Sequence, residues 1–381
     1  MFWSAALQPP RLIPHNHEIT SPMDLVTHGL ASFAVARAFF PRSTKQASVY
    51  AVFGGIIADV DWLSRFAGPS AFLRWHATYT HSILGAILLS AIIPAALLAG
   101  LFWGGFGFEL PKGTPLPQDS SAVRKLRLQT FQSALPVALA APLCAALLHI
   151  AMDACQSEGV ALFWPFSAKR IALDWLPSLD PWILIILIGA VALPELLHLV
   201  SSEIGAKAKK PRGQTGAAIG LLLLVVYVGV RATLHSNVLA MMQSRTFHGE
   251  TPRRAAAFPE TLSLLTWHGI VETERALDET TVDLAASGSF DSDSGLRVFK
   301  PEPSPALDAA GKTSAAARFL AVARFPKATV EKTETGFVVQ LRDLRYTASG
   351  DTQHELAALI QLDLNGKVTS QELVWARDLP R

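Results

Sequence analysis

The sequence predicts an α-helical polytopic membrane domain followed by a small, mainly β soluble domain. Of the 381 residues, 50% are hydrophobic and only 17% are charged, whereas a soluble globular chain carries about 25% charged residues. Several stretches reach or approach the roughly 20 apolar residues that cross a bilayer, and dense charge returns after Asn237. These observations divide the chain into an N-terminal extension (1–22), a membrane domain (23–237) and a C-terminal domain (245–381).

We expect about six hydrophobic helices in the membrane domain. The four clearest candidates span 82–103, 134–154, 182–200 and 217–234, and two shorter apolar runs precede them at 30–40 and 49–63. The extension is proline-rich and lacks the continuous apolar core of a signal peptide, so we expect it to be disordered. Met23 opens the first apolar run, and translation from this residue is an alternative to translation from Met1.

The C-terminal domain contains alternating, strand-like runs at 261–272, 316–324, 336–344 and 356–364. The dipeptide Asn365-Gly366 lies between LIQLDL and KVTSQELVW, which is a strong hairpin signal. Between these runs, the segment 286–315 is rich in small and polar residues and is expected to be a long loop.

The distribution of Lys and Arg predicts the orientation in the membrane, because these residues accumulate in short cytoplasmic loops. The loops 41–48, 104–132 and 201–215 are the richer ones, whereas 64–81 and 155–181 are poorer. With six helices, the poorer loops and the C-terminal domain lie outside the cytoplasm. A net charge of +2 without a long basic run gives no support to nucleic-acid binding. The two cysteines fall together in one helix, which argues against a disulfide framework or zinc finger.

His149 and Asp153 are the ionisable side chains, apart from the two thiols, in the apolar run 134–155. At i and i+4 they lie on one face of a helix, about one turn apart. Charge in a membrane-length helix is costly and is usually retained because it acts with a partner. An imidazole and a carboxylate at this spacing are good metal ligands. The alternative is a hydrogen-bonded pair that locks two helices together.

Further candidate ligands reach the same predicted outer face of the membrane: His28, Asp59, Asp61, His76 and His81. Three or four histidines with two or three aspartates suit zinc, with manganese or iron as alternatives. Several carboxylates would also allow two ions to be held close together. Without a metal these carboxylates would need buried cationic partners, and few Lys or Arg lie near them in sequence.

Each of these residues also has a structural alternative. His28 and His81 fit capping or interfacial positions, and His76 fits a plain surface loop. Asp59 and Asp61 point in different directions on a helix, so we favour Asp59 as the ligand. Asp61 would then either orient a ligand histidine or act as the general base, the catalytic role, on the attacking water.

Five segments carry a resemblance to a known family: MDLVTHGLASFAVAR, GGIIADVDWL, HATYTHSILG, LLHIAMDACQSEGVALFWPFSAKRIAL and DWLPSLDPWILI. In this order, over about residues 23–200, they resemble the YdjM-like family of membrane-bound, metal-dependent hydrolases. The resemblance implies a protein of the bacterial inner membrane and a distant similarity to zinc-dependent phospholipases C and P1-type nucleases.

The ligand order of those enzymes implies a corresponding set in this chain: His28, Asp59 or Asp61, His76 or His81, His149 and Asp153. Their pattern continues with a His-x-x-x-Glu pair, and no such pair follows Asp153 within the membrane domain 23–237. The resemblance therefore implies one or two divalent ions, zinc above all, and not a three-metal cluster.

Ser167, Lys169 and Arg170 follow the His-x-x-x-Asp helix on the predicted outer side. They are candidates for holding an anionic substrate group such as a lipid phosphate. The alternative is an interfacial anchor, with Trp164 and Trp175 at the level of the headgroups.

Together these features predict a membrane-bound hydrolase in which metal-activated water attacks a phosphoester or other ester, with a lipid or lipid-linked substrate favoured by a site at headgroup depth. The alternative is a non-catalytic membrane protein with a metal-stabilised structural core and a partner-binding C-terminal domain. Cation transport is disfavoured, because the ionisable residues gather at helix ends and no internal repeat is visible. Glu195 with His198 falls on the cytoplasmic side, and Arg231 with His235 is a weak candidate site.

Overall fold

The computed structural model describes residues 24–103, 120–203, 213–286, 290–347 and 355–379. The chain forms two compact units, one covering Thr20–Lys300 and the other including Pro301–Arg381. The expected extension 1–22 lies outside the described residues, as do most of the basic residues of two predicted cytoplasmic loops, Lys112, Lys207, Lys209, Lys210 and Arg212.

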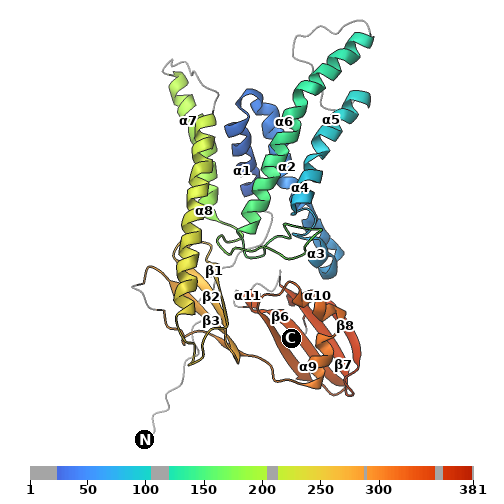
Figure 1. The fold of residues 1–381 in the computed structure, drawn as a ribbon, viewed down its shortest axis with the longest axis vertical. Helices are drawn as coiled ribbons and strands as arrows, with labels where there is room; N and C mark the ends of the chain where they lie inside the picture. Colours follow the sequence, from blue (N-terminus) through green and yellow to red (C-terminus); the bar gives the residue numbers. More distant parts are fainter. Residues whose placement is uncertain (1–23, 104–119, 204–212, 287–289, 348–354, 380–381) are drawn as a thin grey trace. The chain divides into compact units, whose positions relative to one another are not determined.

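The first unit contains the helical domain (Figure 1). Its helical elements are α1 (Asp24–Phe39), η1 (Pro41–Ser43), α2 (Thr44–Ile56), η2 (Ile57–Ala67), α3 (Pro69–Trp75), α4 (Ile83–Ser90), α5 (Ile92–Trp103), α6 (Ser120–Ala154), α7 (Pro181–Glu203) and α8 (Gln214–Gln243).

Four segments of the described chain are long and apolar enough to cross a membrane: Pro41–Ala67, Ile83–Gly100, Ser121–Ala154 and Gln214–Gln243. Two shorter apolar helices, Leu25–Phe39 and Pro181–Leu196, accompany them. The predicted polytopic helical domain is thus confirmed, although two of the six expected helices are shorter than a full span.

The regular α-helical winding is interrupted in two of the apolar segments. The 3₁₀ segment η2 continues α2 with a tighter winding of three residues per turn. The helix break at Ala91, between α4 and α5, comes three residues before Pro94. Proline lacks an amide hydrogen and its ring clashes with the carbonyl four residues earlier, so a continuous helix is disfavoured there.

Small residues allow α1, α2 and α6 to approach closely. Ala51 on α2 and Ala141 and Ala145 on α6 are completely buried in one cluster, as is usual where membrane helices pack through small side chains. A Cβ atom on Gly54 would lie 2.4 Å from the Cα of Pro142. Because Gly54 has no side chain, the end of α2, and therefore the start of η2, can lie directly against the second half of α6.

The two loops that were predicted to share the outer face contact one another. The backbone amide of Ala161 donates to the carbonyl of Ala77 at 3.0 Å, and the amide of Ile83 donates to the carbonyl of Leu162 at 3.1 Å. The loop 155–180 lies across the end of the bundle at which α6 ends (Figure 1). The start of α4 is therefore fixed relative to the loop that follows α6.

The first unit also includes an antiparallel sheet in the order β1-β2-β3-β4, with β1 (Arg254–Pro259), β2 (Thr266–Glu272), β3 (Ala276–Asp283) and β4 (Arg297–Phe299). The last turns of α8 pack on this sheet, where Val238 and Met242 are buried against Trp267.

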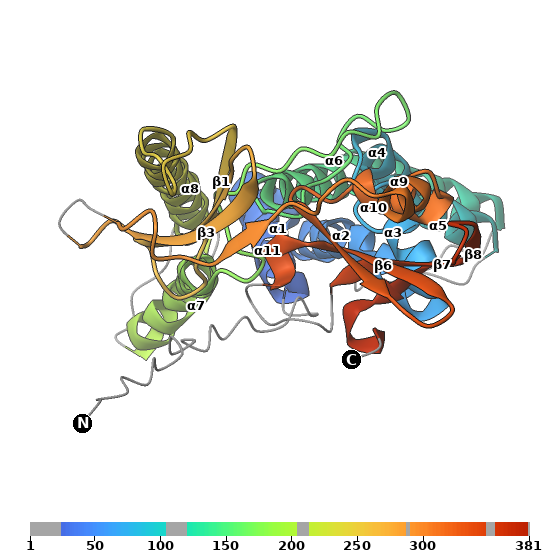
Figure 2. The same cartoon turned by 90° about the horizontal axis from the view of Figure 1, so that it is seen from below.

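The second unit is an antiparallel meander β5-β6-β7-β8 with two short helices packed on it (Figure 2). Its elements are α9 (Pro305–Gly311), α10 (Ser314–Leu320), β5 (Pro326–Lys332), β6 (Gly336–Asp343), α11 (Leu344–Thr347), β7 (Leu356–Asp363), β8 (Val368–Trp375) and η3 (Ala376–Asp378).

The predicted hairpin at Asn365-Gly366 is confirmed, because β7 and β8 pair antiparallel across it and Gly366 has φ +78°. The strand predicted at 316–324 is wrong, since residues 314–320 form helix α10. The loop predicted at 286–315 is also wrong in part, because it includes β4 and α9.

Candidate metal centre

Seven candidate ligands come from four places in the fold that meet at one end of the bundle. His28 lies on α1, Asp59 and Asp61 on η2, His76 and His81 on either side of the turn between α3 and α4, and His149 with Asp153 in the last turns of α6. Of these, His28, Asp61, His81, His149 and Asp153 are buried.

His149 is the meeting point of the cluster. Its Nε2 atom lies 3.0 Å from Oδ2 of Asp153 and 3.1 Å from Nε2 of His81. Asp153 also approaches His81 Nε2 at 3.2 Å and, through Oδ1, His28 Nε2 at 3.1 Å. The Oδ1 atom of Asp59 lies 3.5 Å from His149 Nε2. Two overlapping groups of possible metal ligands result, His28–His149–Asp153 and Asp59–His81–His149, each with donor atoms within 4.8 Å of one another.

In His149 and His81, the hydrogen bond made by Nδ1 decides which of the two ring nitrogens carries the proton in the neutral ring. Nδ1 of His149 lies 2.6 Å from the carbonyl oxygen of Gly55, and because a carbonyl only accepts, Nδ1 must donate. Nδ1 of His81 likewise faces Oδ2 of Asp61 at 3.0 Å. In the neutral rings both Nε2 atoms are therefore unprotonated, and their lone pairs face each other. A cation between them removes this repulsion.

The charge of the cluster is negative. Asp59, Asp61 and Asp153 all have ion pairs within the described part of the chain, and each of these partners is a histidine. Burial lowers the pKa of His81, but the three carboxylates outweigh burial and hold that pKa well above its ordinary value, so the cluster favours a positive charge at this ring, whether a proton or a metal ion.

Asp61 is held by four donors. Its Oδ1 faces Nδ1 of His76 at 3.1 Å, and Oδ2 accepts from the amide of Ala77 at 3.0 Å and from Thr80 Oγ1 at 2.5 Å, as well as from His81. In the η2 winding, Asp59 and Asp61 thus lie at opposite nitrogens of the His81 ring, Asp59 near Nε2 and Asp61 at Nδ1. This geometry is the carboxylate–histidine pair that orients metal ligands in many proteins.

His76 does not join the ring around His149. Its Nδ1 faces Asp61, its Nε2 lies 3.7 Å from Oε2 of Glu158, and its ring stacks on Phe72. Arg170 donates from Nη2 to the His76 carbonyl at 2.7 Å. Ser167 and Lys169 are exposed beside it in the same loop.

The remaining candidates lie apart from the centre. Glu195 pairs with Arg37 at 2.9 Å, and Arg231 is bonded to the carbonyl of Trp175. Burial, together with the charge of Asp153, raises the pKa of the Cys155 thiol to about 11, so this thiol stays protonated. The sequence reasoning missed the Gly55 carbonyl and Thr80; Thr80 precedes His81 directly, but no sequence signal marks a backbone carbonyl.

Comparison with known proteins places this geometry in a family. The YdjM inner membrane protein family model matches residues 23–238, more than half of the chain. The chain belongs to the YdjM inner membrane protein family. This match confirms the resemblance stated from the sequence. All seven candidate ligands lie within the matched residues. The distant similarity to phospholipases C and P1-type nucleases stays a prediction.

The second unit matches a different family model, the YfhP C-terminal alpha/beta plait domain, over residues 305–379. A protein of Bacillus subtilis (strain 168) named "Uncharacterized protein YfhP" is 25% identical to this YdjM-family chain over 171 residues. That stretch is 45% of this chain and 43% of the relative, so the chain spans less than half the length of the curated relative that it matches. No solved structure matches the chain.

Proposed function

We propose that this YdjM-family protein is a membrane-bound, metal-dependent hydrolase whose ion is held by His28, His81, His149 and Asp153, with Asp59 alongside. The observation that carries the proposal is that the Nε2 atoms of His81 and His149 face one another at 3.1 Å beside Asp153. Imidazoles with carboxylates fit zinc, and the two overlapping ligand groups fit either one ion or two.

A divalent metal in this position would polarise an ester or phosphoester oxygen and lower the pKa of a coordinated water. The chain's own residues prepare the site for such a reaction. The Gly55 carbonyl and Asp61 fix the tautomers of His149 and His81. Because its two oxygens already have four donors, Asp61 acts as a positioning residue in this proposal. Asp59 Oδ2 is buried and has no hydrogen-bond partner in the described part of the chain, so it is the oxygen that accepts the proton of the attacking water.

The substrate in this proposal is a phosphoester or other ester of a lipid or lipid-linked molecule. Ser167, Lys169 and Arg170 follow the centre in the loop 155–180, and Arg170 is tied to the carbonyl of His76. Their hydroxyl and cations suit an anionic headgroup. The bias of Lys and Arg among the loops supports an orientation in which this loop and the C-terminal domain lie outside the cytoplasm.

Metal analysis combined with an activity assay tests the proposal. The purified full chain in detergent is loaded with zinc, and its metal content and its hydrolysis of bis(p-nitrophenyl) phosphate and p-nitrophenyl acetate are measured. We expect at least one ion per chain and hydrolysis that a chelator abolishes and zinc restores. His149→Ala should lose both. Asp59→Asn should lose hydrolysis more than metal.

His248→Asn is the matched control, because His248 lies outside the centre at φ +48°, a conformation that asparagine tolerates. It should keep both metal and activity. A wild-type chain that retains no metal, or His149→Ala with unchanged hydrolysis, contradicts the proposal. Retained metal without hydrolysis, and unfolding on chelation, would instead support the non-catalytic alternative.

A further inference from the structure

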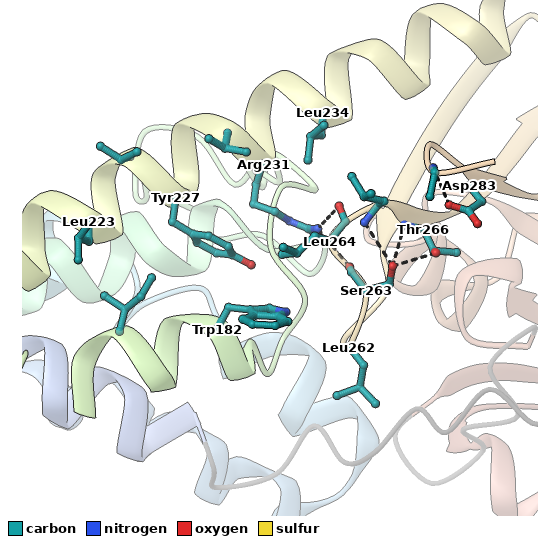
Figure 3. A pocket seen from close by; sticks show the side chains of 15 residues that line it. Trp182, Leu223, Tyr227, Arg231, Leu234, Leu262, Ser263, Leu264, Thr266 and Asp283 are labelled. Atoms are coloured by element: carbon teal, nitrogen blue, oxygen red, sulfur yellow. Dashed lines mark hydrogen bonds between the residues drawn. The ribbon is translucent and has the colours of Figure 1, made fainter. Parts of the chain in front are cut away.

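A second site lies between α7, α8 and the loop that leads into β2. It is a groove of about 860 Å³, which falls in the usual range for small-ligand pockets. Its walls are mainly apolar and include Trp182, Ile186, Leu223, Val226, Val230 and Leu234 (Figure 3). None of its lining residues belongs to the candidate metal centre.

One buried cation, Arg231, reaches into this apolar groove (Figure 3). The residue is 1% exposed and its guanidinium lies 4.5 Å above the ring of Trp267. Its Nε donates to the carbonyl of Trp175, and its Nη1 donates to the carbonyls of Ser263 and Leu264. Nη2 is buried and has no hydrogen-bond partner among the described residues.

The nearby carboxylates form no close ion pair with Arg231, although the charge of Asp180 acts on the guanidinium at longer range. Asp180 accepts from the hydroxyl of Tyr227 at 2.7 Å and from the amide of Trp182. Asp283 lies beyond Thr266 in Figure 3 and accepts from the amide of Ala285. Within the described residues no carboxylate oxygen comes within 4 Å of the Arg231 guanidinium. A buried cation in this state lacks the close anionic partner that usually offsets its desolvation.

We propose that the groove binds one anionic lipid of the bilayer, with an acyl chain between α7 and α8 and the acidic headgroup on Nη2 of Arg231. Leu223, Val226 and Val230 on the α8 span are all about half exposed, so an acyl chain reaches them directly from the surrounding lipid. Trp182 lies in the first turn of α7, the position at which tryptophans meet headgroups. Basic pockets between membrane helices recognise anionic headgroups, and guanidinium groups bind phosphate with charge-assisted hydrogen bonds.

This site goes beyond the proposed hydrolase and does not depend on it, because lipid binding can be measured without turnover. The test is native mass spectrometry of the full chain in detergent, titrated with phosphatidylglycerol or with phosphatidylcholine of the same acyl chains. We expect one phosphatidylglycerol to be retained per chain, with at least tenfold preference over phosphatidylcholine.

A matched pair of variants locates the binding. Val226→Trp fills the groove, whereas Val225→Trp changes the neighbouring residue on α8, which is 69% exposed and does not line the groove. Val226→Trp should weaken phosphatidylglycerol binding at least tenfold, and Val225→Trp should leave it unchanged. Arg231→Gln should remove the preference for phosphatidylglycerol, and Arg231→Lys should restore part of it.

Equal retention of the two lipids, or equal binding by Val226→Trp and Val225→Trp, overturns the proposal. The valine pair keeps the test decisive even where Arg231→Gln does not fold, because both valines are exposed and have no polar role.

Discussion

Asp61→Asn separates a positioning role from a catalytic or purely structural one. Asparagine is nearly isosteric, and its amide oxygen can take the place of Oδ2, which accepts from Ala77, Thr80 and His81. The amide nitrogen then faces Nδ1 of His76, which becomes the acceptor by a change of tautomer. The hydrogen bonds survive in number, but the negative charge behind the His81 ring is lost.

The size of the effect follows from the hydrogen bond to His81 Nδ1. A hydrogen bond to a charged group contributes about 1.5–3 kcal/mol, against about 0.5–1.5 kcal/mol for a neutral one. The lost difference of about 1–1.5 kcal/mol corresponds to about tenfold in metal affinity, and partners behind ligand histidines typically change affinity by ten- to a hundredfold. We therefore expect Asp61→Asn to weaken zinc binding about tenfold while the protein stays folded.

The assay is a zinc titration in competition with a chromophoric chelator, with the unfolding temperature measured in parallel. Asp343→Asn is the control, since Asp343 is another buried carboxylate that accepts from several backbone amides, those of Arg324, Phe325 and Arg345, but lies in the second unit. It should lower only the unfolding temperature. An unchanged zinc affinity in folded Asp61→Asn would refute the reasoning.

Two further predictions concern the scaffold. Gly54→Val should destabilise the helical domain by about 1–3 kcal/mol, because a Cβ would lie 2.4 Å from the backbone of Pro142; thermal unfolding in detergent measures this, and wild-type stability would contradict the described packing. Burial raises the pKa of Glu272, but ion pairs with Lys300 and Arg254 outweigh it and lower that pKa below its ordinary value. This stabilisation is therefore present above the ordinary pKa of about 4.3 and is lost as the pH falls through the lowered value. Hydrogen exchange of β2 amides should show an acid-induced loss of protection that is smaller in Glu272→Gln, and an equal loss in both proteins would count against the ion pairs.

The candidate site was largely predictable because it consists of histidines and aspartates, which are rare in apolar helices. The spacing of His149 and Asp153 and the loop charges together placed five further residues at the same predicted membrane face. The structure brings three of them, His28, Asp59 and His81, into the ligand groups around His149, and Asp61 contacts both His81 and His76. The different directions of Asp59 and Asp61 were also expected. The 3₁₀ winding that sets them at opposite nitrogens of His81 was not, because it depends on tertiary contacts.

The errors in the C-terminal part have a common cause. Residues 316–324 form a short apolar run that was predicted as a strand, but Thr313 accepts from the amide of Ala316 and caps an alanine-rich helix. Ser304 caps α9 in the same way, with Pro305 in its first turn. The N-cap residues of both helices are visible in the sequence, but the prediction gave more weight to the short apolar pattern. The packing that makes these seven-residue helices stable comes from the sheet, which the local sequence does not encode.

X-ray absorption spectroscopy of the zinc-loaded full chain tests the central claim most directly, namely that the His28, His81, His149 and Asp153 side chains hold one metal centre. The account predicts nitrogen and oxygen ligands at about 2.0–2.2 Å, with imidazole scattering from at least two rings that is absent in His149→Ala because this variant loses the ion. Sulfur ligation, or an identical spectrum for His149→Ala, would contradict it.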